Sequence, residues 1–348
     1  MEESFWQDFD PSGPGLANGH LYGLPHSPAQ ARLVLIPVPW DATVSYAAGT
    51  HRGPQAILDA SLQVDLYDPI LPEGWKAGIA MADMPAHLLD LNKAARQQAR
   101  QVIAGLEKGL DVASFEEACK QVNDSCAEMT AWVKAQAVYW LDQGKIVGVL
   151  GGDHSTPLGL MQALAERSPQ FGILQIDAHL DLREAYEGFG ASHASIMYNA
   201  LRLPQVSKLV SVGIRDYCEE EHAFVQRHSQ RVAVFPYRDL AQQQFHGMSW
   251  AEQVQLIVDS LPQQVYVSFD IDGLNPTLCP HTGTPVPGGL EFEQSMYLIG
   301  QVRASGRQII GVDLCEVAPG PDGNEWDANV GARVLYRLFL ETIKANPS

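Results

Sequence analysis

Two aspartate clusters, each placed directly after an apolar segment, are the part of this chain best suited to chemistry. One is Asp177-Ala-His179-Leu-Asp181 and the other is Asp270-Ile-Asp272. Residues i, i+2 and i+4 of an extended strand share a face, so the side chains of each cluster can converge on one point. Carboxylates gathered at the end of a buried strand repel one another and lose solvation, and a bound metal ion relieves both costs most directly. We therefore predict a metal site at these strand ends.

A third apolar segment, 147–150, leads into Gly151-Gly-Asp-His154 and adds an imidazole to the set. Four carboxylates match the charge of two divalent cations, and oxygen ligands with some imidazole suit a hard metal such as Mn²⁺. The alternative is that these residues are solvated loop acids or helix caps. It would have to account for ligand-type residues at the ends of three separate strands. The six candidate ligands are His154, Asp177, His179, Asp181, Asp270 and Asp272.

These segments together resemble the ureohydrolases, a family that includes arginase, agmatinase, guanidino-acid hydrolases and formiminoglutamase. The blocks that carry the resemblance are Gly151-Gly-Asp-His154-Ser155, Asp177-Ala-His179-Leu-Asp181 and Ser268-Phe-Asp270-Ile-Asp272-Gly-Leu-Asn275-Pro276. Flanking matches are Val38-Pro-Trp-Asp41, Gly49-Thr50, Gly53-Pro-Gln-Ala-Ile57 and Gly283-Thr-Pro-Val-Pro-Gly-Gly289. The resemblance runs from about residue 32 to about residue 343, and three ordered blocks at the right spacing make it specific.

The resemblance implies a binuclear centre of two Mn²⁺ ions, with Ni²⁺ or Co²⁺ as possible replacements. Asp177 and Asp270 would bridge the two ions. The other ligands would divide into two shells, His154 with Asp181 and His179 with Asp272. Such a centre activates water for attack on a planar guanidinium carbon, and the amine leaves after protonation. Attack and departure both require proton transfer.

Three further residues acquire roles from the same resemblance. His193 follows the second ligand block at the position of the family's proton-shuttle histidine, which formiminoglutamases lack. Glu316, after the apolar run 308–314, stands where the family grips the guanidinium by charge-assisted hydrogen bonds. Asp153 would buttress a metal ligand from behind. The glycines around Asp153 fit no phosphate-binding loop pattern.

Composition narrows the class of protein. The 348 residues include 46% hydrophobic residues and carry a net charge of −18, which argues against nucleic acid or an anionic membrane as a partner. The five cysteines are odd in number and show no Cys-x-x-Cys spacing, so a reducing compartment is expected. The N-terminus lacks the features of a secretion signal, and no apolar run is long enough for a membrane span. We predict a cytoplasmic location.

Strands and helices are expected to alternate along the chain. We predict strands at 33–36, 146–150, 172–176, 209–214, 232–235, 265–269 and 308–314, and helices at 93–109, 113–143, 157–166, 194–201, 250–261 and 328–344. This order implies βαβ units and an α/β fold, a three-layer α-β-α sandwich with a mostly parallel sheet, which the resemblance makes arginase-like. Sites in such sheets lie beyond the carboxyl ends of the strands, where every ligand block falls. Residues 31–348 are expected to form one domain, preceded by an irregular arm at 1–30.

Departures from the family pattern leave the substrate open. Asn275 replaces a usual aspartate and is expected to be a turn residue. His281 stands where Gly or Asn is expected, and could reach the pocket or lie on the surface. In the loop 182–187, Arg183 could bind a substrate carboxylate, as in arginine, guanidino acids or formiminoglutamate. Glu184 or Glu187 could instead bind the distal ammonium of agmatine.

The main hypothesis is an amidinohydrolase that cleaves a small guanidino or amidino compound, agmatine first, to urea and an amine. A catalytically weak regulatory paralogue and a single-metal deacetylase of similar architecture are the alternatives. The resemblance implies a homotrimer or homohexamer. Aromatic residues at both ends of the chain could serve contacts between subunits or fold back on their own chain: Phe5, Trp6, Phe9, Tyr22, Tyr336 and Phe339.

Overall fold

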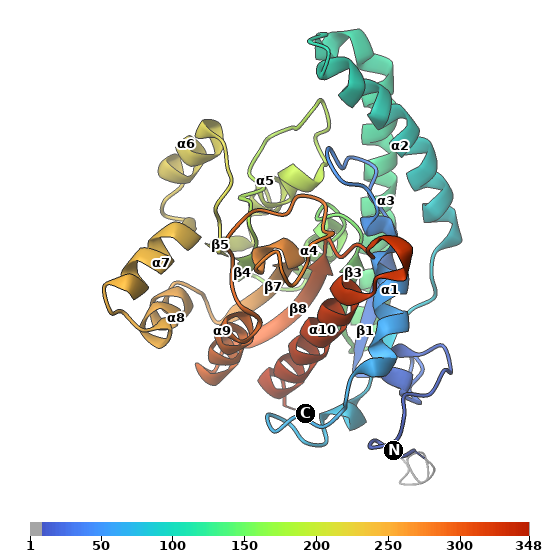
Figure 1. Ribbon diagram of the computed structural model, residues 1–348, viewed down its shortest axis with the longest axis vertical. Coiled ribbons are helices and arrows are strands. Elements are labelled where there is room, and N and C mark those ends of the chain that lie inside the picture. The colour runs from blue at the N-terminus through green and yellow to red at the C-terminus, as the bar shows by residue number, and fades with distance from the viewer. Residues whose placement is uncertain (1–8, 348) are drawn as a thin grey trace.

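The apolar runs of the sequence form the strands of one parallel sheet in the computed structural model, which describes residues 9–347 (Figure 1). The strands are β1 (Leu33–Val38), β2 (Ile79–Met81), β3 (Ile146–Gly151), β4 (Phe171–Ile176), β5 (Val206–Val212), β6 (Val232–Phe235), β7 (Gln264–Asp270) and β8 (Gln308–Cys315). Their order is β2-β1-β3-β8-β7-β4-β5-β6, and each neighbouring pair is parallel. The expected α/β class is therefore confirmed.

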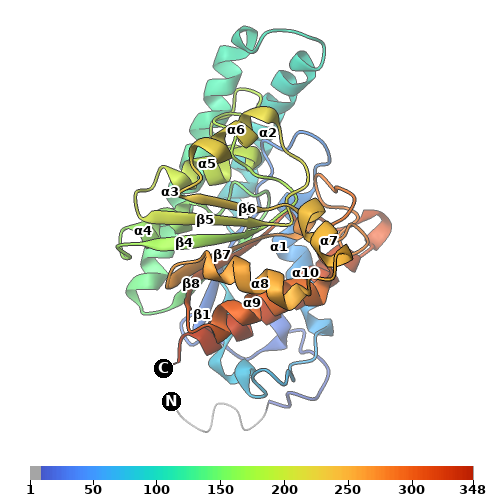
Figure 2. The same ribbon diagram turned by 90° about the vertical axis from the view of Figure 1, so that its left-hand side faces the viewer.

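Helices cover both faces of the sheet, as Figure 2 shows from the side. They are α1 (Gly53–Ala60), α2 (Ala86–Leu106), α3 (Glu116–Asp142), α4 (Leu158–Ala165), α5 (Ile196–Leu201), α6 (Glu219–Arg227), α7 (Tyr237–Phe245), α8 (Trp250–Asp259), α9 (Phe292–Ala304) and α10 (Trp326–Ala345). One hydrophobic core joins α1 and α8–α10 to one face, and a second joins α2–α5 to the other. Alternate residues of a strand serve the two cores: on β7, Val265 and Val267 face the first and Tyr266 faces the second. This gives the predicted three layers.

The sequence missed several elements. The short strand β2 and the helices α1, α6, α7 and α9 were not expected from the sequence, and α1 begins at Gly53, the first residue of one of the flanking blocks. The helix expected at 93–109 runs over Ala86–Leu106, beginning directly after Pro85. Helix α9 buries Ser295 and Gly300 beside its apolar residues, which weakens its apolar periodicity.

The N-terminal segment packs on its own chain where the structure describes it. The Tyr22 hydroxyl donates a hydrogen bond of 2.9 Å to the carbonyl of Ala332, and its ring lies 5.0 Å from that of Tyr336. The ring of Phe9 lies 5.1 Å from that of Trp75. Phe5 and Trp6 lie outside the described residues.

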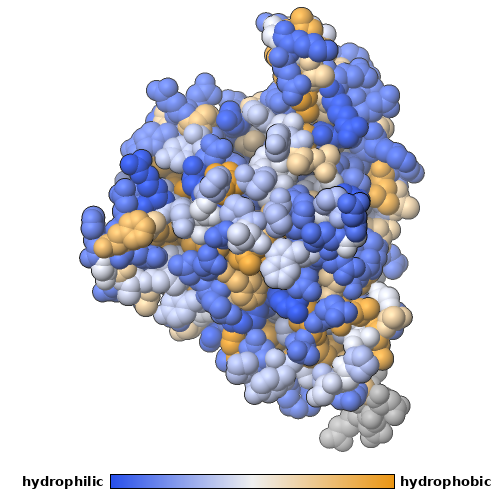
Figure 3. All heavy atoms as spheres, viewed as in Figure 1, coloured by the Kyte–Doolittle hydropathy of each residue, from blue (hydrophilic) through white to orange (hydrophobic). Residues whose placement is uncertain are grey.

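Hydrophilic residues dominate the face in Figure 3, and apolar areas on it are smaller and scattered. Within residues 9–347, none of the helices combines the length and apolar character needed to cross a membrane. The cysteines are all free thiols.

Candidate active site

The predicted site residues meet at the carboxyl ends of four neighbouring central strands. Asp153 and His154 follow β3, the first aspartate cluster follows β4, the second begins at the last residue of β7, and Glu316 follows β8. These strands are adjacent in the order β3-β8-β7-β4, so sheet topology alone brings together segments far apart in sequence. Sites of α/β sheets form at this edge because the loops after parallel strands converge there.

Three of the four candidate aspartate ligands, Asp177, Asp181 and Asp270, surround His154. Its Nδ1 lies 3.0 Å from an oxygen of Asp177, 3.0 Å from one of Asp181 and 3.4 Å from one of Asp270. None of these oxygens is aligned for a hydrogen bond, so the buried Nδ1 has no hydrogen-bond partner among the described residues. The opposite ring nitrogen, Nε2, lies 2.9 Å from the Ser268 hydroxyl, which fixes the ring. His154 therefore turns one nitrogen toward a shell of carboxylate oxygens.

His179 lies near Asp272 and the second oxygen of Asp177. Its Nδ1 lies 3.1 Å from Asp272 Oδ2 and 3.6 Å from Asp177 Oδ1. The two oxygens of Asp177 thus face different imidazoles, which is the arrangement that a bridging carboxylate requires. Asp270 presents Oδ2 to His154, while its Oδ1 accepts the backbone N–H of Asp272.

The described residues contain three groups of donor atoms close enough to hold a cation, and Asp177 belongs to two of them. These two are His154 with Asp177 and Asp181, and Asp177 with His179 and Asp272. A third group pairs His154 with Asp313 and Cys315, but it would need the ring nitrogen that already faces Ser268. Asp270 belongs to neither of the first two groups, although its Oδ2 faces His154 Nδ1.

The electrostatics of the cluster fit bound cations. Burial, followed by the charge of Asp177, raises the pKa of Asp181 to about 7, and burial with Asp272 raises that of Asp270 well above its ordinary value. Burial acts in the same sense on Asp177, but its contacts with His154 and His179 outweigh it and lower the pKa of this carboxyl. Without cations the cluster must take up protons to relieve its charge, whereas divalent ions would relieve it with the carboxylates ionised.

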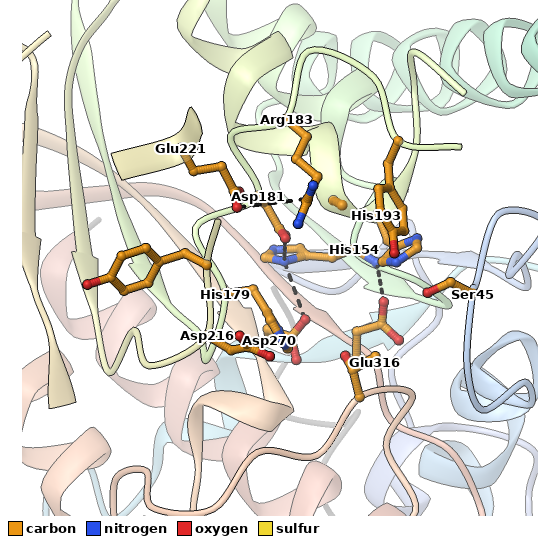
Figure 4. Close-up of a pocket in the computed structure, with 14 residues that line it drawn as sticks. Ser45, His154, His179, Asp181, Arg183, His193, Asp216, Glu221, Asp270 and Glu316 are labelled. Carbon is orange, nitrogen blue, oxygen red and sulfur yellow. Dashed lines mark hydrogen bonds and ion pairs between the residues drawn. The ribbon is translucent and has the colours of Figure 1, made fainter. Parts of the chain in front are cut away.

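Glu316 enters the same cavity from the opposite side to Arg183 and Glu221 (Figure 4). Its Oε1 accepts the backbone N–H of His154 at 2.9 Å, and its buried Oε2 has no partner among the described residues. Burial raises its pKa well above the ordinary value, and the charge of Asp153 adds to this. Its φ of 63° is uncommon for a residue with a side chain and marks a strained position of the kind found at functional sites. Glu316 thus offers one unpaired oxygen to a cationic group.

His193 lies at the edge of the same cavity in a short 3₁₀ turn, His193–Ser195. The Thr43 hydroxyl lies 3.4 Å from its Nδ1, and the Tyr186 ring meets it edge-on at 6.0 Å. Burial and then the nearby positive charges of His179 and Arg96 lower the pKa of His193 to about 3. The imidazole is therefore neutral near pH 7.

Arg183 lines the cavity, but its guanidinium is engaged. It lies 4.8 Å from the centre of the Tyr186 ring, and its Nε lies 3.8 Å from the buried Glu221 carboxylate. Asp153 is fully buried and accepts hydrogen bonds from the N–H and hydroxyl of Ser155 rather than contacting a candidate ligand. Burial raises the pKa of Asp153 to about 7.

The sequence left open the roles of Asn275, His281, Glu184 and Glu187, and the structure places them at different sites. Asn275 accepts from the N–H and hydroxyl of Thr277, as a turn residue does. His281 does not line the cavity, and its Nδ1 lies 2.7 Å from Oδ2 of the buried Asp327. Glu184 lines an adjacent cavity of about 630 Å³ that shares the Arg183 wall, and Glu187 lines neither.

The active-site cavity itself has a volume of about 170 Å³ and includes residues that the sequence reasoning missed. They are Ser45, Tyr186, Ala194, Asp216, Tyr217, Glu221 and Thr284. Two carried usable signals. Asp216 follows the end of β5, which is the rule that found the other carboxylates, and Thr284 lies in the block 283–289 that was recognised without being given a role.

Comparison with known proteins gives a consistent result over nearly the whole chain. A family model described as Arginase family matches residues 31–340. The N(1)-aminopropylagmatine ureohydrolase of Thermus thermophilus is 32% identical over 310 residues, 89% of this chain and 90% of the relative. The agmatinase of Bacillus subtilis is 26% identical over 319 residues, 90% of this chain and 93% of the relative.

Solved structures share the fold. The agmatine ureohydrolase of Thermoplasma volcanium superposes with a TM-score of 0.72 at 23% identity, over 94% of this chain and 96% of that one. The proclavaminate amidino hydrolase of Streptomyces clavuligerus gives 0.69 at 23% identity, over 96% and 100%. At this identity the likeness establishes the architecture.

Proposed function

We propose that this chain releases urea from an agmatine-type guanidino amine. The premise is that the chain belongs to the arginase family of ureohydrolases, which are hydrolases that act on C–N bonds of linear amidines. One observation carries the proposal. The unpaired Oε2 of Glu316 and the neutral ring of His193 open on the same small cavity as two imidazole–carboxylate groups that fit cations. A guanidinium needs an anionic grip, a proton acceptor and an activated water, and this cavity has groups for each.

The six ligands would hold two divalent cations, Mn²⁺ first, with Asp177 and Asp270 shared between them. Bound there, the cations would lower the pKa of water and polarise the reacting carbon's surroundings. Glu316 would accept N–H groups of the guanidinium through its free oxygen and fix the planar group over the carboxylate cluster. His193, at the cavity wall, would accept a proton from the attacking water and pass it on to the leaving amine. Asp153 would hold the turn that presents His154.

The substrate's outer half would meet Asp216, Glu221 and Arg183. Asp216 is exposed at the cavity mouth and offers a carboxylate to a distal ammonium, as agmatine carries. N(1)-aminopropylagmatine is the second candidate, favoured by the relatives named for it and by the adjacent cavity of about 630 Å³, which could hold a longer tail. Arg183 keeps arginine, guanidino acids and formiminoglutamate on the test panel, since a substrate carboxylate could displace its contact with Glu221.

The test is urea or formamide release from each of these compounds after reconstitution with Mn²⁺, Ni²⁺ or Co²⁺, with bound metal measured on the same sample. About two equivalents of metal with urea from an agmatine-type amine supports the proposal. One equivalent would favour the deacetylase alternative. Two equivalents with no turnover on any compound would favour a catalytically weak paralogue and refute the proposal.

We also propose a homotrimer or homohexamer in the cytoplasm. The free cysteines support a reducing compartment, and the family supports the assembly. Light scattering on the full chain tests the assembly, and a monomer at micromolar concentration would refute it.

A further inference from the structure

The segment 41–49 separates the active-site cavity from helix α2 and has no role in the chemistry described so far. On the cavity side, Ser45 lines the wall and the Thr43 hydroxyl lies within 3.4 Å of both the backbone N–H and Nδ1 of His193. In the part of the chain that the structure describes, Thr43 is the one side chain within hydrogen-bonding distance of the His193 ring nitrogens. The direction of that hydroxyl therefore bears on the direction of the ring.

The ends of the segment are drawn together by the buried carboxylate of Asp41. One oxygen accepts the N–H of Gly49 at 2.9 Å and faces His51 Nδ1 at 2.7 Å, and the other accepts from the Asn92 amide at 3.0 Å. Asn92, on α2, returns a bond by accepting the backbone N–H of Asp41 at 2.8 Å. Burial acts to raise the pKa of Asp41, but the bonds from His51 and Asn92 outweigh it and leave the value at about 2. Asp41 is thus ionised near pH 7 and available to accept these hydrogen bonds.

The centre of the segment is held by Arg96, one helical turn beyond Asn92 on α2. Its Nη1 donates to the carbonyl of Ala42 at 3.3 Å and also to the carbonyl of Val44. These carbonyls belong to the residues on either side of Thr43. A guanidinium bonded to both restricts rotation of the peptide groups that flank Thr43, and with them the direction in which its side chain leaves the backbone.

We infer that Arg96 is a positioning residue for the reaction: it fixes the backbone on both sides of Thr43, and Thr43 orients the imidazole of His193. This rests on the proposed function, because it takes His193 as the proton carrier. Arg96 does not line the cavity, and its hydrogen bonds go to the carbonyls of Ala42 and Val44 rather than to a candidate cation ligand. Its loss should therefore spare metal binding and substrate binding and should slow the step that needs His193, on whose pKa the charge of Arg96 also acts.

The experiment compares Arg96→Gln, Arg96→Lys, Thr43→Val and the double variant Arg96→Gln/Thr43→Val with the wild type. Displacement of a catalytic group by about 1 Å costs roughly 100-fold, so Arg96→Gln and Thr43→Val should each lower kcat by about 10- to 100-fold, with KM and bound metal unchanged. The solvent deuterium isotope effect on kcat should rise, because proton transfer becomes slower than the other steps. Arg96→Lys should recover part of the loss, since its ammonium can still reach a carbonyl.

The double variant tests the route. If Arg96 acts through Thr43, adding Arg96→Gln to Thr43→Val should cost nothing further, whereas independent effects would multiply. Arg100→Gln is the matched control, because Arg100 is an exposed cation on the next turn of the same helix and should leave kcat unchanged.

Three results would overturn the inference. The first is a loss of kcat in the double variant that equals the product of the two single losses. The second is an Arg96→Gln variant that melts at a lower temperature but has a normal kcat and isotope effect per folded enzyme. The third is a crystal structure of Arg96→Gln with the Thr43–His193 contact intact. The crystal structure tests the positioning even in a protein that hydrolyses none of the panel. In that case the proposed function fails separately. Should Arg96→Gln not fold, Arg96→Lys and Thr43→Val carry the same comparisons.

Discussion

Replacing Glu316 by Gln probes the proposed grip on the guanidinium with almost no change in shape. In the wild type Oε1 accepts the His154 N–H and Oε2 is unpaired. The amide will keep its oxygen toward that N–H, because the reverse orientation would set two donors against each other. Its NH₂ group then faces the substrate, where the carboxylate had offered an acceptor to a cation.

The magnitude follows from that exchange. Hydrogen bonds to charged groups contribute about 1.5–3 kcal/mol each, and a donor facing a donor adds a desolvation cost of about 1–3 kcal/mol. Together these predict a loss of about 2.5–6 kcal/mol, which is a fall in kcat/KM of roughly 10²- to 10⁴-fold. Bound metal should stay at the wild-type level, since Glu316 is not among the candidate ligands. The melting temperature should not fall, because the amide fills the same volume and removes a buried charge.

The assay is steady-state urea release from the best substrate of the panel, with bound metal determined by mass spectrometry and melting followed by calorimetry. Glu325→Gln provides the control, because Glu325 is exposed near the start of α10 and loses the same charge. A kcat/KM for Glu316→Gln within about threefold of the wild type would refute the assigned grip. Lost metal would instead mean that Glu316 supports the cation ligands.

Three further predictions follow from the same contacts. Asp177→Asn should remove most bound metal, because Asp177 faces both imidazoles, and retention of two equivalents would exclude a bridging role. His193→Ala should keep its metal while kcat falls by about 10²- to 10⁴-fold, and metal loss would show that His193 is no proton carrier. Tyr22→Phe should lower the free energy of unfolding by about 1 kcal/mol in urea, through loss of the bond to Ala332, with the oligomer unchanged. A dissociated oligomer would place Tyr22 at a subunit contact.

The inner half of the site, formed by the candidate cation ligands, could be predicted from sequence because each ligand directly follows a recognisable strand. Strand ends are marked by the change from apolar to acidic residues, and charges placed there have to be neutralised. The same rule places Asp177 beside Asp270, even though the sequence does not state that β4 and β7 are neighbours. The parallel α/β pattern supplies that step by putting all carboxyl ends at one edge.

The fold was predictable in its class and less so in its smaller elements. Long apolar runs identified seven of the strands, whereas β2 is three residues long and carries too little pattern. Helix α6 begins with Glu219, Glu220 and Glu221, of which the last is buried at the cavity wall. A run of three acids reads as a solvated surface, and burial of one of them depends on tertiary contacts that periodicity does not express.

The outer half of the site, the part of the cavity wall beyond the candidate cation ligands, depends on contacts between distant segments. For that reason the substrate was the least predictable feature. Its wall is assembled from Ser45, Arg183, Asp216 and Thr284, each on a different loop, and from Glu221 in the first turn of α6. Loop conformations depend on particular anchors, such as the contact of Arg183 with Glu221 and the bonds from α2 to the segment 41–49. A change in one anchor would reshape the wall without touching a candidate ligand. In the proposed function, chemistry and specificity are therefore separable: the carboxylates and imidazoles at the sheet edge would carry the reaction, and the loop anchors would decide which substrate can reach them.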